Sequence, residues 1–191
     1  MSKALKITLW IIGTLVILGL LFTFVVGPVL KKSTKKHSPE VTETFTIDDL
    51  EVVVFYSSPS KKDRVIFGEL VPYGEVWRTG ANEATTFSTN KDLLIDGKTL
   101  PAGEYTLWTI PGEKEWEIIF NSKMYSWGVR WQDSKAMREA EHDVLVATAT
   151  VSESITSEEN FSIKVVETPN QTIVMLLAWD QVVVPLPIAV K

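Results

Sequence analysis

The chain of 191 residues contains no cysteine, which excludes disulfide bonds, thiolate metal sites and a cysteine nucleophile. Its charges are unevenly divided, because residues 1–36 hold six lysines and no acid, while the rest holds 13 basic and 24 acidic residues, a net charge of −11. A domain this acidic repels phosphate backbones, so nucleic acid is not expected as a partner.

An uncharged run from Ile7 to Leu30 lies near the start of the chain. As a helix, its 24 residues would be about 36 Å long, enough to cross a hydrocarbon core of about 30 Å with some tilt. The run lacks the polar stripe of a buried core helix and ends without a small-x-small cleavage site. We therefore predict an uncleaved single-pass anchor, with residues 1–36 comprising a cytoplasmic stub, the transmembrane helix and a basic flank.

Lysines flank the span on both sides. Lys3 and Lys6 precede it, and four follow it: Lys31, Lys32, Lys35 and Lys36. By count alone, the positive-inside tendency favours a cytoplasmic location for everything after the span.

A polar segment over residues 37–44, which contains Pro39, predicts a short linker because proline disfavours helix. Strand signals follow. Enrichment in β-branched and aromatic residues predicts strands over Leu50–Tyr56, Val65–Leu70 and Ala84–Thr89.

The clearest hairpin follows, because Leu93–Ile95 runs into Asp96-Gly97, a favoured two-residue turn. Beyond it, Glu104–Ile110 and Trp116–Phe120 predict two further strands separated by a Pro-Gly turn. In the second of these, Trp116, Ile118 and Phe120 share one face, as the two-residue period of a strand requires.

The second half repeats this style, with strands predicted over Val144–Val151 and Phe161–Val165. Thr172–Trp179 is apolar on both faces and predicts a central strand, whereas Val182–Ile188 contains two prolines and predicts an edge strand. Only Ser134–Glu141 has a helical pattern. Many short strands separated by turns indicate an all-β fold over residues 45–191, an antiparallel β-sandwich or barrel-like domain.

Three stretches carry a family resemblance: PSKKDRVIFGELVPYGEVWRTGANEATTFS, DGKTLPAGEYTLWTIPGEKEWEIIFN and the later SWG. They resemble the domain-of-unknown-function family 2911, over roughly residues 45–188. The resemblance implies an exported domain behind a signal sequence or lipid anchor, and it brings no established activity. It favours an extracytoplasmic domain, against the lysine count. This chain differs from that pattern in its predicted uncleaved anchor.

Motifs for catalysis or metal binding are absent from the sequence. The two histidines, His37 and His142, form no His-x-x-His pair, so neither a metal nor a cofactor is expected. No Gly-x-Ser-x-Gly elbow and no phosphate-binding glycine loop occurs. Acids are abundant, so a pair of catalytic carboxylates stays open as an alternative.

Six tryptophans lie in the predicted domain, and exposed ones could stack on sugar rings or pack against a partner. Trp116 and Trp179 lie on strand faces and predict core positions. Trp77, Trp127 and Trp131 lie in turn-rich segments, where the sequence leaves exposure open.

The stretch VWRTGANEAT, residues 76–85, places an arginine between Trp77 and Thr79, just before a glycine that permits positive φ. One interpretation is structural: Arg78 pairs with Glu83 and ties a loop to the sandwich, while Asn82 caps a turn. The other is a ligand pocket in which Arg78 binds an anion. The candidate binding residues are Arg64, Trp77, Arg78, Asn82 and Glu83.

Together these patterns predict a bacterial-type membrane protein whose anchored, extracytoplasmic β-domain binds an envelope component, a glycan or a partner protein. The alternatives are a hydrolase with an acidic site near Arg78 and a purely structural envelope protein. Geometry separates them: a deep pocket where Arg78, Asn82 and carboxylates converge favours an enzyme, and a shallow aromatic groove favours binding.

Overall fold

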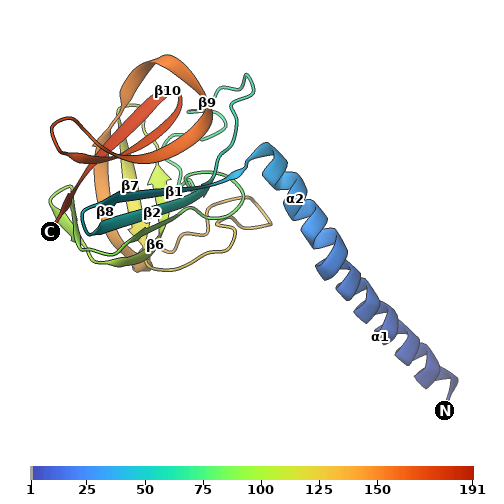
Figure 1. The fold of residues 1–191 in the computed structure, drawn as a ribbon. Coiled ribbons are helices and arrows are strands. Elements are labelled where there is room, and N and C mark those ends of the chain that lie inside the picture. The colour runs from blue at the N-terminus through green and yellow to red at the C-terminus, as the bar shows by residue number, and fades with distance from the viewer. Residues whose placement is uncertain (1) are drawn as a thin grey trace. The chain divides into compact units, whose positions relative to one another are not determined.

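The computed structural model describes residues 2–191, except the side chains of residues 30–32, so those of Lys31 and Lys32 in the predicted basic flank lie outside the described residues. The chain divides into two compact units, one ending at His37 and the other spanning Ser38–Lys191. Figure 1 shows a helical first unit and a second unit built from strands.

The first unit is a helix in three parts: α1 (Lys3–Leu21), a π-helical turn (Phe22–Val26) and α2 (Gly27–His37). The π turn ends two residues before Pro28, whose ring would clash with the carbonyl four residues earlier. The N–H of the intervening Gly27 bonds to the Phe22 carbonyl, five residues back. The whole helix is long and apolar enough to cross a membrane. It continues to His37, so only Ser38 and Pro39 separate it from the first strand, in place of the longer polar linker expected.

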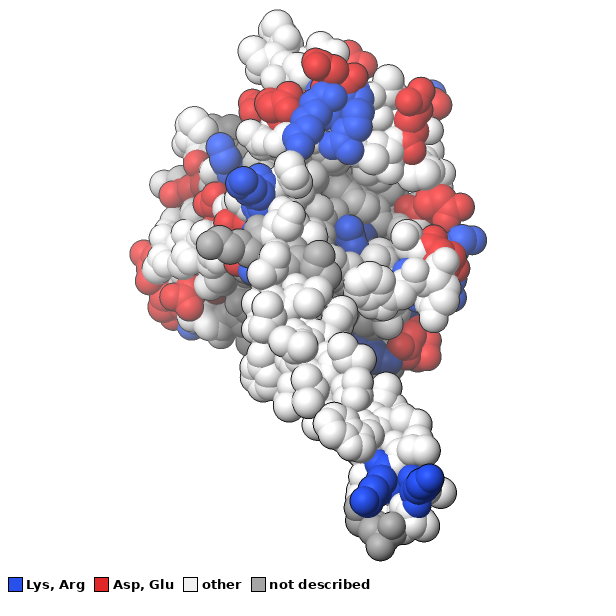
Figure 2. All heavy atoms as spheres, turned by 90° about the vertical axis from the view of Figure 1, so that its right-hand side faces the viewer, with Lys and Arg blue, Asp and Glu red and all other residues white. Residues whose placement is uncertain are grey.

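Polar groups within the apolar helix are bonded inside it. The hydroxyl groups of Thr8, Thr14 and Thr23 each donate to the carbonyl oxygen four residues earlier, at 2.9–3.1 Å. Side chains of α1 have no protein cover, and Trp10 is 78% exposed. Figure 2 shows the helix as an uncharged surface with basic side chains near its end, whereas the domain surface mixes both signs. These features suit a lipid environment.

The second unit is a two-layer antiparallel sandwich (Figure 1). The larger sheet has the order β1-β2-β3-β6-β7-β8, and the smaller has the order β5-β4-β10-β9. The strands of the larger sheet are β1 (Glu40–Ile47), β2 (Leu50–Ser57), β3 (Thr86–Thr89), β6 (Gly103–Ile110), β7 (Glu115–Asn121) and β8 (Asp143–Thr150). Those of the smaller are β4 (Leu93–Ile95), β5 (Lys98–Leu100), β9 (Ser152–Glu167) and β10 (Ile173–Val190). The all-β prediction is confirmed, as a sandwich and not a closed barrel within the described residues.

The core lies between the two sheets, where alternate residues of each strand point inward. Trp116 and Trp179 are 2% and 1% exposed, as their strand positions predicted. They join Phe67, Trp77 and Phe161 in one aromatic cluster with ring centroids 4.9–6.4 Å apart. Such aromatic contacts, edge-to-face except for the stacked pair Trp77–Trp179, stabilise a core by about 0.5–1.5 kcal/mol each beyond their burial.

Several predicted elements differ from the structure. The segment Val65–Leu70 is a turn and not a strand, because the Val71 N–H bonds back to the Ile66 carbonyl at 2.8 Å. The predicted helix Ser134–Glu141 is wrong: its backbone bonds across a loop, and only the 3₁₀ turn Ala140–His142 is helical.

The last predicted strand also differs, because Val182–Ile188 is the continuation of β10 and not a separate edge strand. Strand β10 pairs with β9 as far as Val183 and with β4 from Ile188. Pro185 and Pro187 fall between these two paired stretches, where a missing N–H breaks no ladder bond.

Strand β1 lies largely within the segment predicted as a linker. The residues on its outward face are polar, so the segment resembles a polar linker in sequence.

Candidate functional site

The stretch 76–85, here called the corner, connects the first turn-rich segment to β3. It runs beside β6, because the backbones of Trp77 and Thr109 exchange hydrogen bonds at 2.7 and 3.0 Å. The Thr85 hydroxyl donates to the Thr79 carbonyl at 2.7 Å, and the Trp77 indole donates to the Gly80 carbonyl at 3.1 Å. The corner is therefore closed by its own side chains.

The corner has an unusual backbone conformation. Thr79 and Asn82 have φ values of 57° and 55°, and Gly80 has 151°. A β-branched residue rarely adopts positive φ, so Thr79 is held there by its surroundings. It is completely buried, and its hydroxyl lies 3.2 Å from that of Thr109.

The five candidate residues divide between different places. Arg64 lies outside the corner and donates to the backbone carbonyls of Ser60 and Lys61. Trp77 is half-buried in the aromatic cluster, and its indole N–H bonds to Gly80. The Asn82 side chain is buried and donates to the Ser38 carbonyl at 3.2 Å, which ties the corner to the start of the domain.

The other two candidates are Glu83, which is half-buried and accepts a hydrogen bond from the Ser57 hydroxyl at 3.2 Å, and Arg78. Arg78 is half-buried and has no hydrogen bond or ion pair from its side chain to any described residue. Its Nη1 atom is sealed from solvent without a hydrogen-bond partner. Burial lowers the pKa of Arg78, and the nearby charge of Glu83 only partly opposes this. The guanidinium is thus a desolvated cation that the protein does not fully compensate.

Arg78 lines a cavity of about 220 Å³. The other lining residues come from the connection between β7 and β8, here called the pocket loop (residues 122–139): Trp127, Val129, Arg130, Trp131 and Ser134. Trp131 is 90% exposed, so its indole stands at the open side of the cavity. The cavity has room for a single small ring and not for a buried chain.

Gly128 is the point at which the backbone of the pocket loop approaches the corner closely enough to leave little room for a side chain. It has a φ of 81°, and a Cβ atom there would lie 3.3 Å from the Cβ atoms of both Arg78 and Ala84. The tip of the loop is closed by a backbone bond from Arg130 to Lys135, and by another from Met137 to Gly128, each at 2.9 Å. Corner and loop are therefore in direct contact at the base of the cavity.

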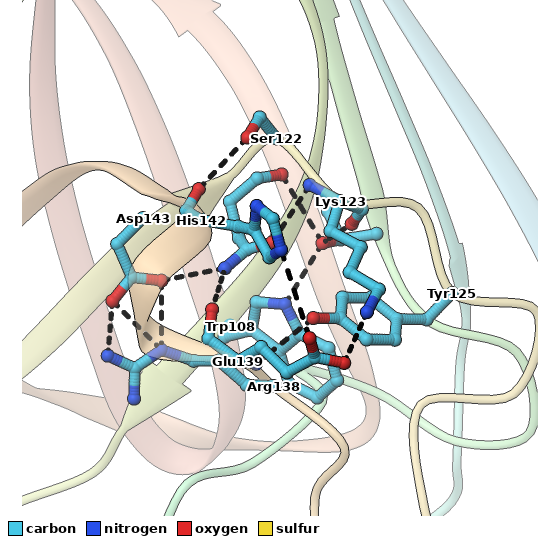
Figure 3. A network of polar contacts seen from close by, with 10 residues as sticks. Trp108, Ser122, Lys123, Tyr125, Arg138, Glu139, His142 and Asp143 are labelled. Atoms are coloured by element: carbon cyan, nitrogen blue, oxygen red, sulfur yellow. Dashed lines mark hydrogen bonds and ion pairs between the residues drawn. The ribbon is translucent and has the colours of Figure 1, made fainter.

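A polar network holds both ends of the pocket loop (Figure 3). Asn121, fully buried at the end of β7, donates to the Glu139 carbonyl at 2.9 Å and to Asp143 Oδ1 at 2.8 Å, and accepts from the Lys123 N–H. Arg138 binds the same Asp143 carboxylate, with Nε at 3.1 Å from Oδ1 (Figure 3). This hydrogen bond raises the pKa of Arg138.

Two aromatic residues of the network, Tyr125 and Trp108, support the pocket loop by packing and hydrogen bonding. Tyr125 packs edge-on against buried Trp108, with centroids 5.2 Å apart, and its hydroxyl accepts from the Glu139 N–H at 3.0 Å. Trp108 in turn donates to the Thr106 hydroxyl at 3.0 Å. The network therefore fixes where the pocket loop begins and ends.

The network also contains the one cluster of metal-ligating side chains found among the described residues: Glu139, Glu141 and His142, whose ligand atoms lie within 4.8 Å of one another. The Glu139 carboxylate is already hydrogen-bonded to Lys123, which lowers the pKa of Glu139. A metal ion would have to compete with that ammonium group, so the arrangement suits an ion-pair network better than a metal site.

The sequence analysis singled out Arg78 but did not predict that the pocket loop lines a cavity together with it. Trp127 and Trp131 were recognised only as tryptophans of undecided exposure, and Val129 and Ser134 gave no signal. The Ser-Trp-Gly triplet at residues 126–128 was the available clue, because a glycine next to a tryptophan in a turn-rich segment often marks a close backbone approach.

The fold and the cavity define a β-sandwich domain with a loop-built cavity, preceded by an apolar helix. The chain belongs to the family of proteins of unknown function DUF2911, whose model matches residues 38–188. Comparison with curated proteins and with solved structures found no match.

Proposed function

We propose that this protein is a membrane-tethered binding domain that holds an envelope glycan in the cavity between the corner and the pocket loop. The observation that carries the proposal is the lining of that cavity, where half-buried Trp127 and 90% exposed Trp131 accompany two arginines. An indole exposed at the mouth of a small cavity is costly in water and provides a flat apolar face on which a sugar ring can stack.

Binding is favoured over hydrolysis by what lines the cavity. None of the lining residues is an aspartate, glutamate or histidine. Asn82, which an enzymatic pocket was expected to share with Arg78, instead bonds to the Ser38 backbone. Without an acid or base at the cavity, general acid–base cleavage of a glycosidic bond has no group to perform it.

The location proposed is the outer side of a bacterial-type cytoplasmic membrane, with the N-terminal helix as the anchor. Its support is the helix that is long and apolar enough to span, together with the export that the family resemblance implies. A tethered domain meets a surface-bound ligand at a high effective concentration, so weak affinity for one sugar unit suffices.

The proposal is tested with the full chain in phosphatidylcholine nanodiscs, titrated against immobilised envelope polysaccharide fractions in an interferometric binding assay. Trp131→Ala is expected to weaken binding at least about tenfold, since stacking on an aromatic ring contributes strongly to such contacts. The matched control is Ile155→Ala on β9, which is 100% exposed and does not line the cavity. Equal affinity of wild type and Trp131→Ala would refute the site, and no binding by the wild type would refute the function.

A further inference from the structure

The four arginines of the domain differ in whether their side chains are hydrogen-bonded to described residues. Arg64 bonds to two backbone carbonyls, Arg130 bonds to the Asp133 carboxylate through Nε at 3.1 Å and Nη2 at 2.6 Å, and Arg138 bonds to Asp143. Arg78 alone among them makes no side-chain hydrogen bond to a described residue.

An arginine without partners is unusual when it is half-buried. A guanidinium group has five N–H donors, and burying a charged group without pairing it is unfavourable. Of its three nitrogens, only Nη1 is sealed off and unbonded, so Nε and Nη2 keep access to the cavity or the solvent. Those two nitrogens form the edge that binds a carboxylate or phosphate in bidentate fashion.

Charges around the cavity are consistent with an anion. Arg130 also lines the cavity, but its charge is compensated by the ion pair with Asp133, so Arg78 is the cation of the lining that is open to an anion. Glu83 lies near enough to act on Arg78 through its charge, but desolvation of Arg78 has the larger effect. An anion placed in the cavity would relieve this imbalance, and it would be bound in surroundings that water screens only weakly.

We propose that the ligand is an acidic saccharide, whose carboxylate or phosphate group binds Arg78 while its ring lies against Trp127 and Trp131. This inference rests on the proposed function and adds the chemical class of the ligand. Arg78 supplies the fork of donors and the positive charge, and the indoles supply the apolar surface.

Chemical treatment of the polysaccharide distinguishes a carboxylate ligand from a phosphate ligand. The probes are three samples of each envelope polysaccharide fraction. One is untreated, in the second carbodiimide and borohydride have reduced carboxylates to alcohols, and in the third hydrofluoric acid has removed phosphates. Binding to the full chain in phosphatidylcholine nanodiscs is expected to fall at least about tenfold after one of the two treatments. Loss after reduction identifies a carboxylate, and loss after hydrofluoric acid identifies a phosphate.

Variants of the protein supply the second arm. Arg78→Gln, which keeps hydrogen bonding and removes the charge, should weaken binding at least about tenfold, and Arg78→Lys should weaken it less because it keeps the charge and loses the fork. Arg64→Gln, outside the cavity, should bind within about twofold of wild type. Unfolding midpoints of each variant show that the fold is retained.

Two outcomes overturn the inference in different ways. Full binding after both treatments, with unaltered affinity of Arg78→Gln, overturns the acidic ligand while leaving a neutral-glycan function intact. Failure of every untreated fraction to bind overturns the proposed function and the acidic ligand together.

Discussion

The indole N–H of Trp77 donates a hydrogen bond to the carbonyl oxygen of Gly80 at 3.1 Å, so a side chain of the aromatic core also fixes the turn beyond Arg78. The backbone on both sides of Arg78 is thereby held by Trp77, Thr79 and Gly80. The guanidinium group makes no side-chain hydrogen bond to any residue that the structure describes, and its Nη1 atom is sealed from solvent. The neighbours of Arg78 thus have structural roles in this corner, and Arg78 itself is the residue for which we propose a role in binding.

Gly80 should tolerate no side chain. A Cβ atom there would lie 2.9 Å from the Ser57 carbonyl oxygen, at a φ of 151°. We expect Gly80→Ala to cost about 2–4 kcal/mol of unfolding free energy, from strain of about 1–2 plus overpacking. Gly97→Ala is the matched control, because it has positive φ but open space around it, and it should cost only about 1 kcal/mol. Equal losses in urea titrations would show that the contact with Ser57 is unimportant.

The domain should fold without the helix. Among the described residues, every buried hydrophobic core residue lies after His37, and Ser38–Lys191 forms a compact unit by itself. A fragment starting at Ser38 is expected to be soluble, to unfold cooperatively and to have a circular dichroism spectrum dominated by strand. A mainly helical spectrum, or unfolding without a transition, would contradict the sandwich.

The domain should be accessible from outside the cytoplasmic membrane. Protease added to intact cells after permeabilisation of any outer membrane should degrade it, while a cytoplasmic marker stays intact. Full protection of the domain would place it in the cytoplasm. The lysines after the span would then have determined the orientation, as the positive-inside tendency describes.

Asp180 should make stability depend on pH. Hydrogen bonds from Lys61 at 2.5 Å and from Ser157 at 2.7 Å lower its pKa below the ordinary 3.8. Because the folded-state pKa is the lower one, this stabilisation is present above about pH 4 and is lost as the pH falls through the folded value.

The variant Asp180→Asn tests this, since asparagine also accepts the positive φ of 54° at this position. It should lower the unfolding free energy by at most about 1 kcal/mol at pH 7, because the pair is partly exposed, and by less at pH 3. Lys61→Met should show the same trend. A deficit that stays constant from pH 7 to pH 3 would assign the effect to something other than the carboxylate charge.

Much of the sandwich could be predicted from local patterns. The hairpin at Asp96-Gly97 and the alternating strand Trp116–Phe120 are encoded by turn chemistry and a two-residue period, and both are present. The helical spacing of Ser134–Glu141 was misleading, because backbone bonds across the pocket loop outweigh a weak local propensity over two turns.

The site was predictable only in part, for a physical reason. Arg78 could be predicted as a candidate because tryptophan, glycine and polar residues lie within a few positions of it in the sequence. The pocket loop lies about fifty residues further along, and its contact with Arg78 through Gly128 depends on the pairing of β6, β7 and β8. A single sequence contains no local signal for such a contact. Likewise, the partners of Asn121 come from the far end of that loop.

The most direct test of Arg78 as a binding residue compares the unfolding of Arg78→Met and Arg138→Met in denaturant. Arg138 forms a structural pair with Asp143 in which both side chains are less than a fifth exposed, so its loss should cost about 2 kcal/mol or more. Arg78 has no bonded partner in the described chain, so Arg78→Met should stay within about 1 kcal/mol of wild type, or exceed it, since methionine removes an uncompensated charge. An Arg78→Met variant destabilised as much as Arg138→Met would contradict the account and make Arg78 a structural link of the corner.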